Sequence, residues 1–97
     1  MKITNKRKLS DFKEAHPDAE KQVNAWQAEV QRAEWKAPNE LTQQFGSASI
    51  LKAGNVVFNI CGNKYRLVVW INYDFHIVYI RFVGTHREYD SIDAQTV

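Results

Sequence analysis

Cysteine is nearly absent from this sequence of 97 residues, and its scarcity excludes two kinds of stabilisation. The one residue, Cys61, has no partner for a disulfide within the chain, and it rules out a zinc site with two or four cysteine ligands. The three histidines stand far apart, at positions 16, 76 and 86, so they form no metal-binding motif. We therefore expect no metal and no other cofactor.

Long apolar stretches are missing too. No run approaches the roughly 18 residues of a transmembrane helix, and the first eight residues lack the apolar centre of a signal peptide. We expect a cytoplasmic protein that makes no contact with membranes. The sequence has no repeats or low-complexity tracts, and 44% apolar residues favour one globular domain spanning residues 1–97.

Helical periodicity occupies the first half of the chain. Thr4 or Asn5 is a candidate cap for a first helix that runs to about Ala15 and buries Leu9 and Phe12. Pro17 suits the first turn of a second, amphipathic helix. Its apolar face recurs at helical spacing through Ala19, Val23, Trp26, Val30 and Ala33.

A short helical turn and then strands follow. Asn39 is predicted to cap a turn that ends at Gly46, after which the apolar period changes to two. The predicted strands are Asn55–Cys61, Lys64–Tyr73 and His76–Gly84, with Ser49–Lys52 as a candidate edge strand. Gly62-Asn63 and Asp74-Phe75 are the two expected hairpin turns.

Two-residue turns at these places fix the register of the strands. Asn59 then lies opposite Arg66, and Leu67 opposite Phe82. One face becomes entirely apolar, with Val56, Phe58, Ile60, Leu67, Val69, Ile71, Val78, Ile80 and Phe82. The sequence thus predicts an α+β fold, in which two N-terminal helices pack on one face of a mostly antiparallel 3–4-stranded sheet that a short C-terminal helix follows.

The opposite face of the predicted sheet is polar and basic. It carries Asn59, Lys64, Arg66, Trp70, Asn72, Tyr79 and Arg81, with Val68 and Val83 between them. Val68 lies opposite Arg81 in this register, so Arg66 and Arg81 are expected to be neighbours with no strand carboxylate facing them. Residues 46–84 hold four Lys/Arg against one acidic residue, a net charge of +3. This pattern favours an anionic ligand, although a solvated basic face would explain the charge alone.

The residues after Arg81 add groups that can transfer protons. Thr85 and Glu88 form an [ST]-x-x-E capping box, so a helix is predicted to start at Thr85. His86 then takes the first helical position and Tyr89 lies three residues on, on the same face. Free N–H groups at the start of this helix are expected to favour a phosphate. Alternatively, Tyr89 packs on the sheet and His86 is a surface residue.

Two segments resemble a known family. Residues 58–68 read Phe-Asn-Ile-Cys-Gly-Asn-Lys-Tyr-Arg-Leu-Val, and residues 79–90 read Tyr-Ile-Arg-Phe-Val-Gly-Thr-His-Arg-Glu-Tyr-Asp. In this order they resemble the HigB toxins, which belong to the RelE-like mRNA interferases of toxin–antitoxin systems. The resemblance extends over nearly the whole chain and implies a single RelE-like toxin domain.

The resemblance also implies an activity and partners. It implies a metal-independent endoribonuclease that cleaves mRNA on the ribosome by 2′-OH attack, giving a 2′,3′-cyclic phosphate and inhibiting translation. It implies a HigA-like helix-turn-helix antitoxin as partner, and contact with operator DNA only through that antitoxin.

Matched to the family's motifs, four residues are candidates for catalysis: Arg66, Arg81, His86 and Tyr89. The arginines are assigned to phosphate charge, and His86 and Tyr89 to proton transfer. Asp90 is a supporting residue that orients His86 or Arg81, or that simply stabilises the helix. The candidate RNA contacts are Lys52, Asn59, Lys64 and Arg87.

Three questions stay open from the sequence. Toxins of the RelE type carry lysines where this chain has Asn59, so the base or acid is His86, Tyr89 or Lys64, and Tyr89 could instead stack on a base. A non-catalytic module that binds RNA or the ribosome would use the same basic sheet. A degenerate toxin that only binds its antitoxin is the third possibility.

Overall fold

The computed structural model describes all residues, 1–97, and has mixed helices and strands. In chain order its elements are β1 (Lys2–Thr4), α1 (Arg7–Ala15), the 3₁₀ helix η1 (Pro17–Ala19), α2 (Glu20–Arg32), α3 (Pro38–Gln44), β2 (Ser49–Ile50), β3 (Val56–Ile60), β4 (Tyr65–Asn72), β5 (Ile77–Thr85) and α4 (His86–Asp90). The strands form one sheet in the order β1-β5-β4-β3-β2, in which only the β1–β5 pair is parallel. The predicted α+β class is confirmed, with five strands in place of three or four.

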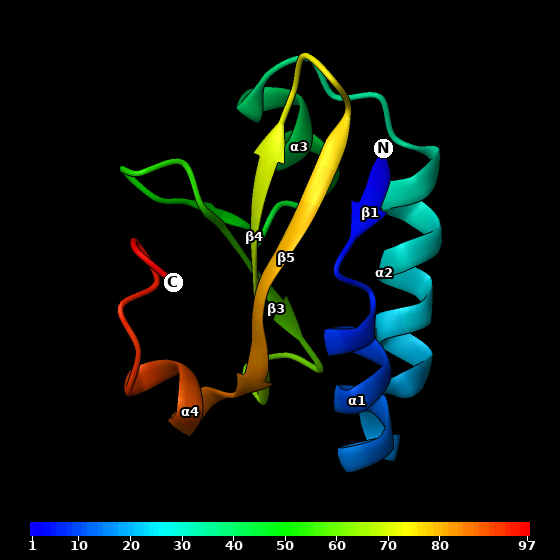
Figure 1. The fold of residues 1–97 in the computed structure, drawn as a ribbon, viewed down its shortest axis with the longest axis vertical. Coiled ribbons are helices and arrows are strands. Elements are labelled where there is room, and N and C mark those ends of the chain that lie inside the picture. The colour runs from blue at the N-terminus through cyan, green and yellow to red at the C-terminus, as the bar shows by residue number, and fades with distance from the viewer.

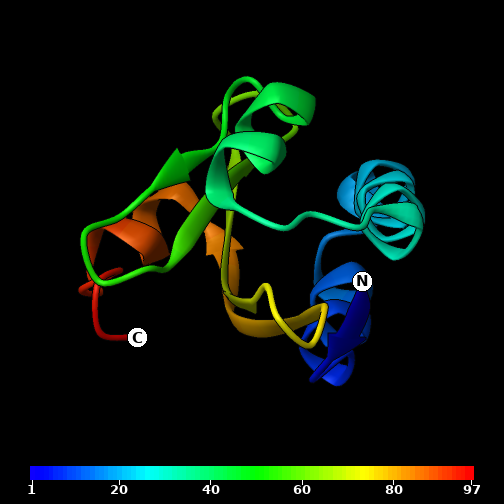
Figure 2. The same ribbon diagram turned by 90° about the horizontal axis from the view of Figure 1, so that it is seen from above.

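The sheet separates two layers of helices. In Figures 1 and 2, α1 and α2 lie on one side of β4 and β5, whereas α4 and the C-terminal segment lie on the other. We call the side of α1 and α2 the inner face and the side of α4 the outer face. The apolar core fills the inner face and includes all five residues predicted for the second helix. None of the helices is both long and apolar enough to cross a bilayer.

The extra strand, β1, explains why the predicted cap of the first helix is wrong. Thr4 belongs to β1, which pairs with Ile77–Tyr79 of β5, and Asn5 has a left-handed backbone with φ 67°. The Asn5 side chain donates a hydrogen bond to the carbonyl of Ile80 at 3.0 Å. Neither residue caps α1, whose N-cap is Lys6. Three residues are too few to show the alternation of apolar and polar residues that is typical of a strand, so β1 could not be predicted from the sequence.

The predicted cap of the third helix is also wrong. Helix α3 begins at Pro38 and its N-cap is Ala37, so Asn39 lies inside the first turn. Proline at the first helical position has a suitable φ and has no N–H to leave unpaired, which explains the earlier start.

The hairpin of β3 and β4 has the predicted register. Phe58 pairs with Leu67, Asn59 with Arg66 and Ile60 with Tyr65. The apolar residues of β3 therefore face the core, and the alternation of side chains was sufficient to align these two strands.

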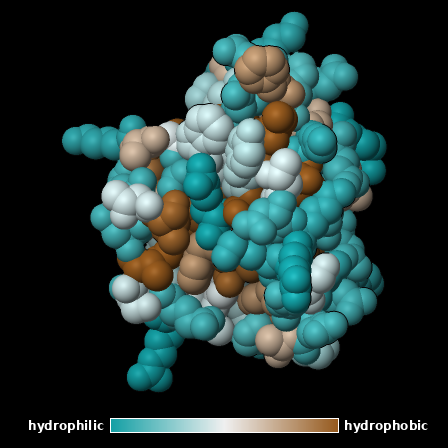
Figure 3. All heavy atoms as spheres, in the orientation of Figure 1, coloured by the Kyte–Doolittle hydropathy of each residue, from teal (hydrophilic) through white to brown (hydrophobic).

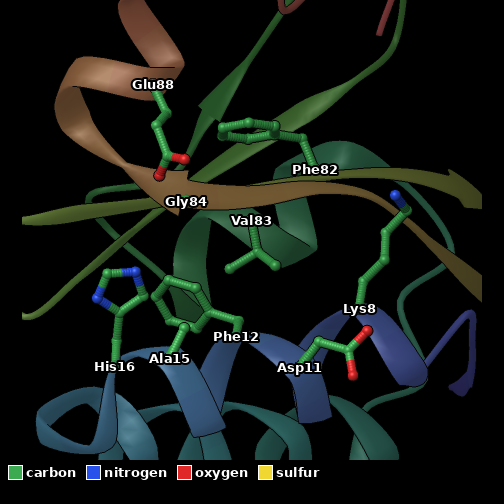
Figure 4. Close-up of a pocket in the computed structure, with 9 residues that line it drawn as sticks. All are labelled: Lys8, Asp11, Phe12, Ala15, His16, Phe82, Val83, Gly84 and Glu88. Carbon is green, nitrogen blue, oxygen red and sulfur yellow. The ribbon is translucent and has the colours of Figure 1, made fainter.

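The register of β4 and β5 is right only as far as Val69 and Ile80. A β-bulge then makes Arg81 an extra residue, so that Val68 pairs with Phe82, and Leu67 with Val83. Phe82 therefore leaves the inner face and Val83 enters it, the reverse of the prediction. Figure 4 shows the two side chains on opposite sides of β5, with Val83 directed toward α1.

Candidate functional site

Helix α4 is fixed firmly to the end of the sheet although it has only five residues. Thr85 Oγ1 accepts a hydrogen bond from the Glu88 N–H at 3.1 Å, and Glu88 Oε1 accepts one from the Thr85 N–H at 2.8 Å. These bonds to Thr85 hold the pKa of Glu88 below its ordinary value. The predicted capping box and helix start are confirmed.

A second contact ties α4 to β4. The backbone N–H of His86 donates to the carbonyl of Lys64 at 3.0 Å, at the residue just before β4 begins. Two N–H groups at the start of α4, those of His86 and Glu88, are therefore already bonded within the protein. These two groups are therefore not free to bind a phosphate.

The bulge and Gly84 make room for α4 on the outer face. Gly84 pairs with Arg66, and a Cβ atom at this position would come within 2.9 Å of both Glu88 Oε1 and Phe82 Cζ. The ring of Phe82 lies 6.4 Å from that of Tyr89, between ring centres. Phe82 therefore supports Tyr89 on the outer face instead of filling the core.

Arg66 and Tyr89 form the centre of the candidate site. The guanidinium carbon of Arg66 lies 5.8 Å from the centre of the Tyr89 ring, within cation–π range. Arg66 Nη1 also donates to the carbonyls of Asn63 at 3.1 Å and of Tyr65 at 3.3 Å. These contacts hold the side chain in place without neutralising its charge.

Arg81 occupies the bulge rather than the predicted position opposite Val68. It is exposed, and its guanidinium carbon lies 6.0 Å from the centre of the Tyr79 ring. Three ion pairs occur in the protein, and neither Arg66 nor Arg81 takes part in one. The outer face therefore carries two positive charges that no carboxylate neutralises, as expected for a site that binds an anion.

His86 and Asp90 form a pair along α4. His86 Nδ1 lies 3.0 Å from Asp90 Oδ2, one helical turn away, and both side chains are about half exposed. A hydrogen on Nδ1 that is donated to Asp90 leaves Nε2 of the neutral ring free to accept a proton. Nucleophilic and general-base sites use the same arrangement, in which a carboxylate fixes the tautomer of a histidine.

The predicted RNA contacts are spread over the surface. Asn59 lies opposite Arg66 in the sheet, next to the site. Arg87 is exposed on α4, and Lys52 is exposed in the loop between β2 and β3. Lys64 instead extends toward η1, where its Nζ lies 2.6 Å from Asp18 Oδ2.

Asp18 organises a polar cluster that the sequence did not predict. Its carboxylate also accepts a hydrogen bond from the hydroxyl of the buried Tyr65 at 2.9 Å. His16 Nδ1 lies 3.4 Å from the same hydroxyl. The hydrogen bond from Lys64, followed by that from Tyr65, lowers the pKa of Asp18, and Asp18 raises the pKa of Lys64. Lys64 therefore stays protonated, which makes it unsuited to act as the base.

The fold and the outer-face site define the class of protein. An α+β domain with two arginines on the open face of its sheet, and a histidine and tyrosine on the helix that follows, corresponds to a RelE-like toxin. Residues 19–92 match the family described as HigB_toxin, RelE-like toxic component of a toxin-antitoxin system. The chain belongs to the HigB family, and a toxin component of such a system implies an antitoxin partner.

Curated relatives agree over almost the full length. The chain is 30% identical over 96 residues to the mRNA interferase toxin HigB of Escherichia coli (strain K12), covering 97% of this chain and 92% of that protein. It is equally similar to the mRNA interferase HigB of Escherichia coli O157:H7 and to that of Shigella flexneri.

Proposed function

We propose that this chain is the toxin of a HigBA-type system and an endoribonuclease that cleaves mRNA on the ribosome and so inhibits translation. The names of its relatives support the reaction class. The observation that carries the proposal is the pair of arginines without carboxylate partners, Arg66 and Arg81, on the face where His86, Tyr89 and Asp90 lie. The proposed reaction is attack of an mRNA 2′-OH on its own 3′-phosphate, giving a 2′,3′-cyclic phosphate and a free 5′-OH.

The arginines stabilise the phosphate in this mechanism. Charge grows on the phosphate oxygens as the 2′-oxygen bonds to phosphorus, and guanidinium groups donate to them in a fixed fork. Arg66 is held by two backbone carbonyls and the Tyr89 ring, so little reorganisation is needed when the substrate binds. Each arginine contributes roughly 10²–10³ in rate.

His86 is the proposed general base and Tyr89 the general acid. Asp90 holds Nδ1 of His86, which leaves Nε2 to remove the proton of the 2′-OH. The Tyr89 hydroxyl then protonates the leaving 5′-oxygen, because Arg66 against its ring places it beside the bound phosphate. Each group contributes about 10²–10⁴ in rate.

The remaining polar residues bind the RNA and the ribosome. Arg87 and Lys52 contact backbone phosphates, and Asn59 contacts the substrate beside Arg66. Lys64 contacts a backbone phosphate only if it leaves Asp18, because that ion pair neutralises its charge. The partner that neutralises the toxin is a HigA-like helix-turn-helix antitoxin, which links it to operator DNA, and the site of action is the translating ribosome of the cytoplasm.

The test is induction of the wild type and of Arg66→Ala in a bacterial host, with growth and mRNA 5′ ends measured together. The wild type is expected to arrest growth and create new 5′ ends within coding regions, and the variant to do neither. Arg32→Ala is the matched control, because Arg32 is an exposed arginine on α2, on the other side of the sheet.

Three outcomes would contradict the proposal. Growth arrest without new 5′ ends would indicate a non-catalytic module that binds RNA or the ribosome. An inert wild type that still binds its antitoxin would indicate a degenerate toxin. A folded Arg66→Ala protein as toxic as the wild type would show that the site is elsewhere.

A further inference from the structure

A second group of aromatic and cationic side chains lies on the outer face, beside the site described above. Trp70 of β4 pairs with Tyr79 of β5, and their ring centres are 5.4 Å apart with the planes tilted by 41°. The guanidinium of Arg81 lies over the same Tyr79 ring. We call Trp70, Tyr79 and Arg81 the aromatic platform.

Trp70 differs from the other two tryptophans of the chain. Trp26 and Trp35 are buried members of the core, whereas Trp70 is only partly buried and lies outside it. The indole N–H of Trp35 donates to Gln44, whereas the indole N–H groups of Trp26 and Trp70 make no hydrogen bond. The N–H edge of Trp70 faces Gly54, where an added Cβ would lie 3.6 Å from Nε1. A partly exposed aromatic ring that lies outside the core suits a ligand with a flat ring.

The platform continues the candidate site along the sheet. Trp70 follows Arg66 by four residues on β4, which at about 3.3 Å per residue is roughly 13 Å. Arg81 lies between the two ends, in the bulge. Beyond Trp70 a shallow pocket of about 360 Å³ is lined by Ile71, Asn72, Tyr73 and Asp74 as well as by Trp70 itself. In Figure 3, pale and teal side chains cover the upper halves of β4 and β5, with brown apolar atoms showing between them.

We propose that the aromatic platform is a nucleobase-binding subsite for the mRNA next to the cleaved phosphate, an inference that rests on the proposed function. Bases of the single strand stack on Trp70 and Tyr79, and Arg81 contacts the phosphate between them and the Arg66–Tyr89 centre. Aromatic rings interleaved with unpaired cations bind single-stranded RNA in this way, because every base has a stacking face and every linkage a negative charge. Arg81 has no carboxylate partner, so it supplies the positive charge beside the rings that a phosphate linkage of the strand requires.

Phe75 supplies a matched control. It is the most exposed large apolar side chain, 75% exposed, and lies in the turn between β4 and β5, close in sequence to the platform. It has no aromatic or cationic partner. Phe75→Leu therefore removes an aromatic ring from the same end of the sheet without touching the platform.

The experiment measures binding of the toxin to ribosomes programmed with a short 2′-O-methyl mRNA, which cannot undergo 2′-OH attack. Tyr79→Leu and Trp70→Leu are expected to weaken binding roughly 5- to 150-fold, the range for loss of one stacked base. Tyr79→Phe and Trp70→Phe, which keep a ring, and Phe75→Leu are expected to bind like the wild type. Abasic positions introduced singly into the mRNA should weaken binding of the wild type at one or two places, and Tyr79→Leu should be insensitive there.

The outcomes separate this subsite from the proposed function. If the wild type binds as expected but never cuts a cleavable mRNA, the proposed function fails and the platform stands. If the wild type cuts, but folded Tyr79→Leu and Trp70→Leu bind 2′-O-methyl mRNA as tightly as Phe75→Leu, the platform is overturned. Loss of antitoxin binding in these variants with unchanged mRNA binding would assign the platform to the partner protein and would equally overturn the proposal.

Discussion

The guanidinium of Arg66 lies against the ring of Tyr89, 5.8 Å from its centre, and joins two residues that are 23 positions apart in the sequence. The contact depends on three local features: the Thr85–Glu88 capping box, the close approach of Glu88 and Phe82 to Gly84, and the bond from His86 to the Lys64 carbonyl. Together they place the last helix over the strand that carries Arg66. A charged group and a hydroxyl thereby meet on the outer face, next to the His86–Asp90 pair.

Two substitutions of Tyr89 separate its ring from its hydroxyl. Tyr89→Phe keeps the contact with Arg66 but removes the proposed acid, so cleavage in single turnover is expected to fall about 10²- to 10⁴-fold. Tyr89→Ala should lower it further, because Arg66 loses its support. Equal rates for Tyr89→Phe and the wild type would show that the ring stacks on a base and that the acid is another group.

Asp90→Ala tests whether the carboxylate positions His86. We expect a smaller loss in the cleavage rate than for His86→Ala, because the imidazole remains but its tautomer and orientation are no longer fixed. Single-turnover rates on programmed ribosomes, measured across pH, would check this. A loss for Asp90→Ala that equals the loss for His86→Ala at every pH would mean that the two residues act only as a unit. No loss for either variant would remove both from the mechanism.

Thr85→Ala should loosen α4. Removing the side chain of an N-cap costs about 1 kcal/mol, and here it also leaves the Glu88 N–H without its partner. We expect faster amide hydrogen exchange in residues 86–90 and a lower cleavage rate, with little change in exchange across β3. Thr96→Ala is a suitable control, since this exposed threonine lies beyond α4. Unchanged exchange in α4 would show that packing of Tyr89 alone holds the helix.

Asp18→Asn should reduce the stability of the protein in a way that depends on pH. The pKa of Asp18 is lowered by Lys64 and then by Tyr65, so its ionised form stabilises the folded state. That contribution is present above the ordinary pKa of about 4 and is lost as pH falls through the lower, folded-state value. The difference in melting temperature between the wild type and Asp18→Asn should therefore be largest near neutral pH and shrink below about pH 4. A difference that stays constant from pH 7 to pH 2 would contradict the assignment.

The sequence predicted those parts of the fold in which two local signals agree. The register of β3 and β4 followed because the Gly62-Asn63 turn and the alternation of apolar residues both require it. The start of α4 followed from a capping box with a defined spacing. The bulge could not be found in this way, since Phe82 and Val83 are both apolar and alternation cannot tell which one enters the core. The pairing of Asp18 with Lys64 joins residues 46 positions apart and has no local signature.

The candidate site was predictable to a similar degree. His86, Tyr89 and Asp90 lie on one short helix. Their relative positions could therefore be predicted once the start of that helix was known. The relation of Arg81 to Arg66 depended on the long-range register, and there the bulge changed it. Whether these residues carry out the proposed chemistry remains a prediction for the experiments above.

The bulge at Arg81 also divides β5 into two halves with opposite tolerance to substitution. Before it the even positions, Val78 and Ile80, face the core, and after it the odd position Val83 does. In a scan of all single substitutions, polar replacements should therefore be rejected at positions 78 and 80 before the bulge and at position 83 after it. A substitution that unfolds the toxin lets the cells that express it grow, so growth measurements would reveal the positions that do not tolerate polar residues. The change in their spacing would locate the bulge without a structure. It also follows that deleting Arg81 would remove the bulge and restore an unbroken register, in which Phe82 stays opposite Val68 on the outer face and Val83 stays opposite Leu67.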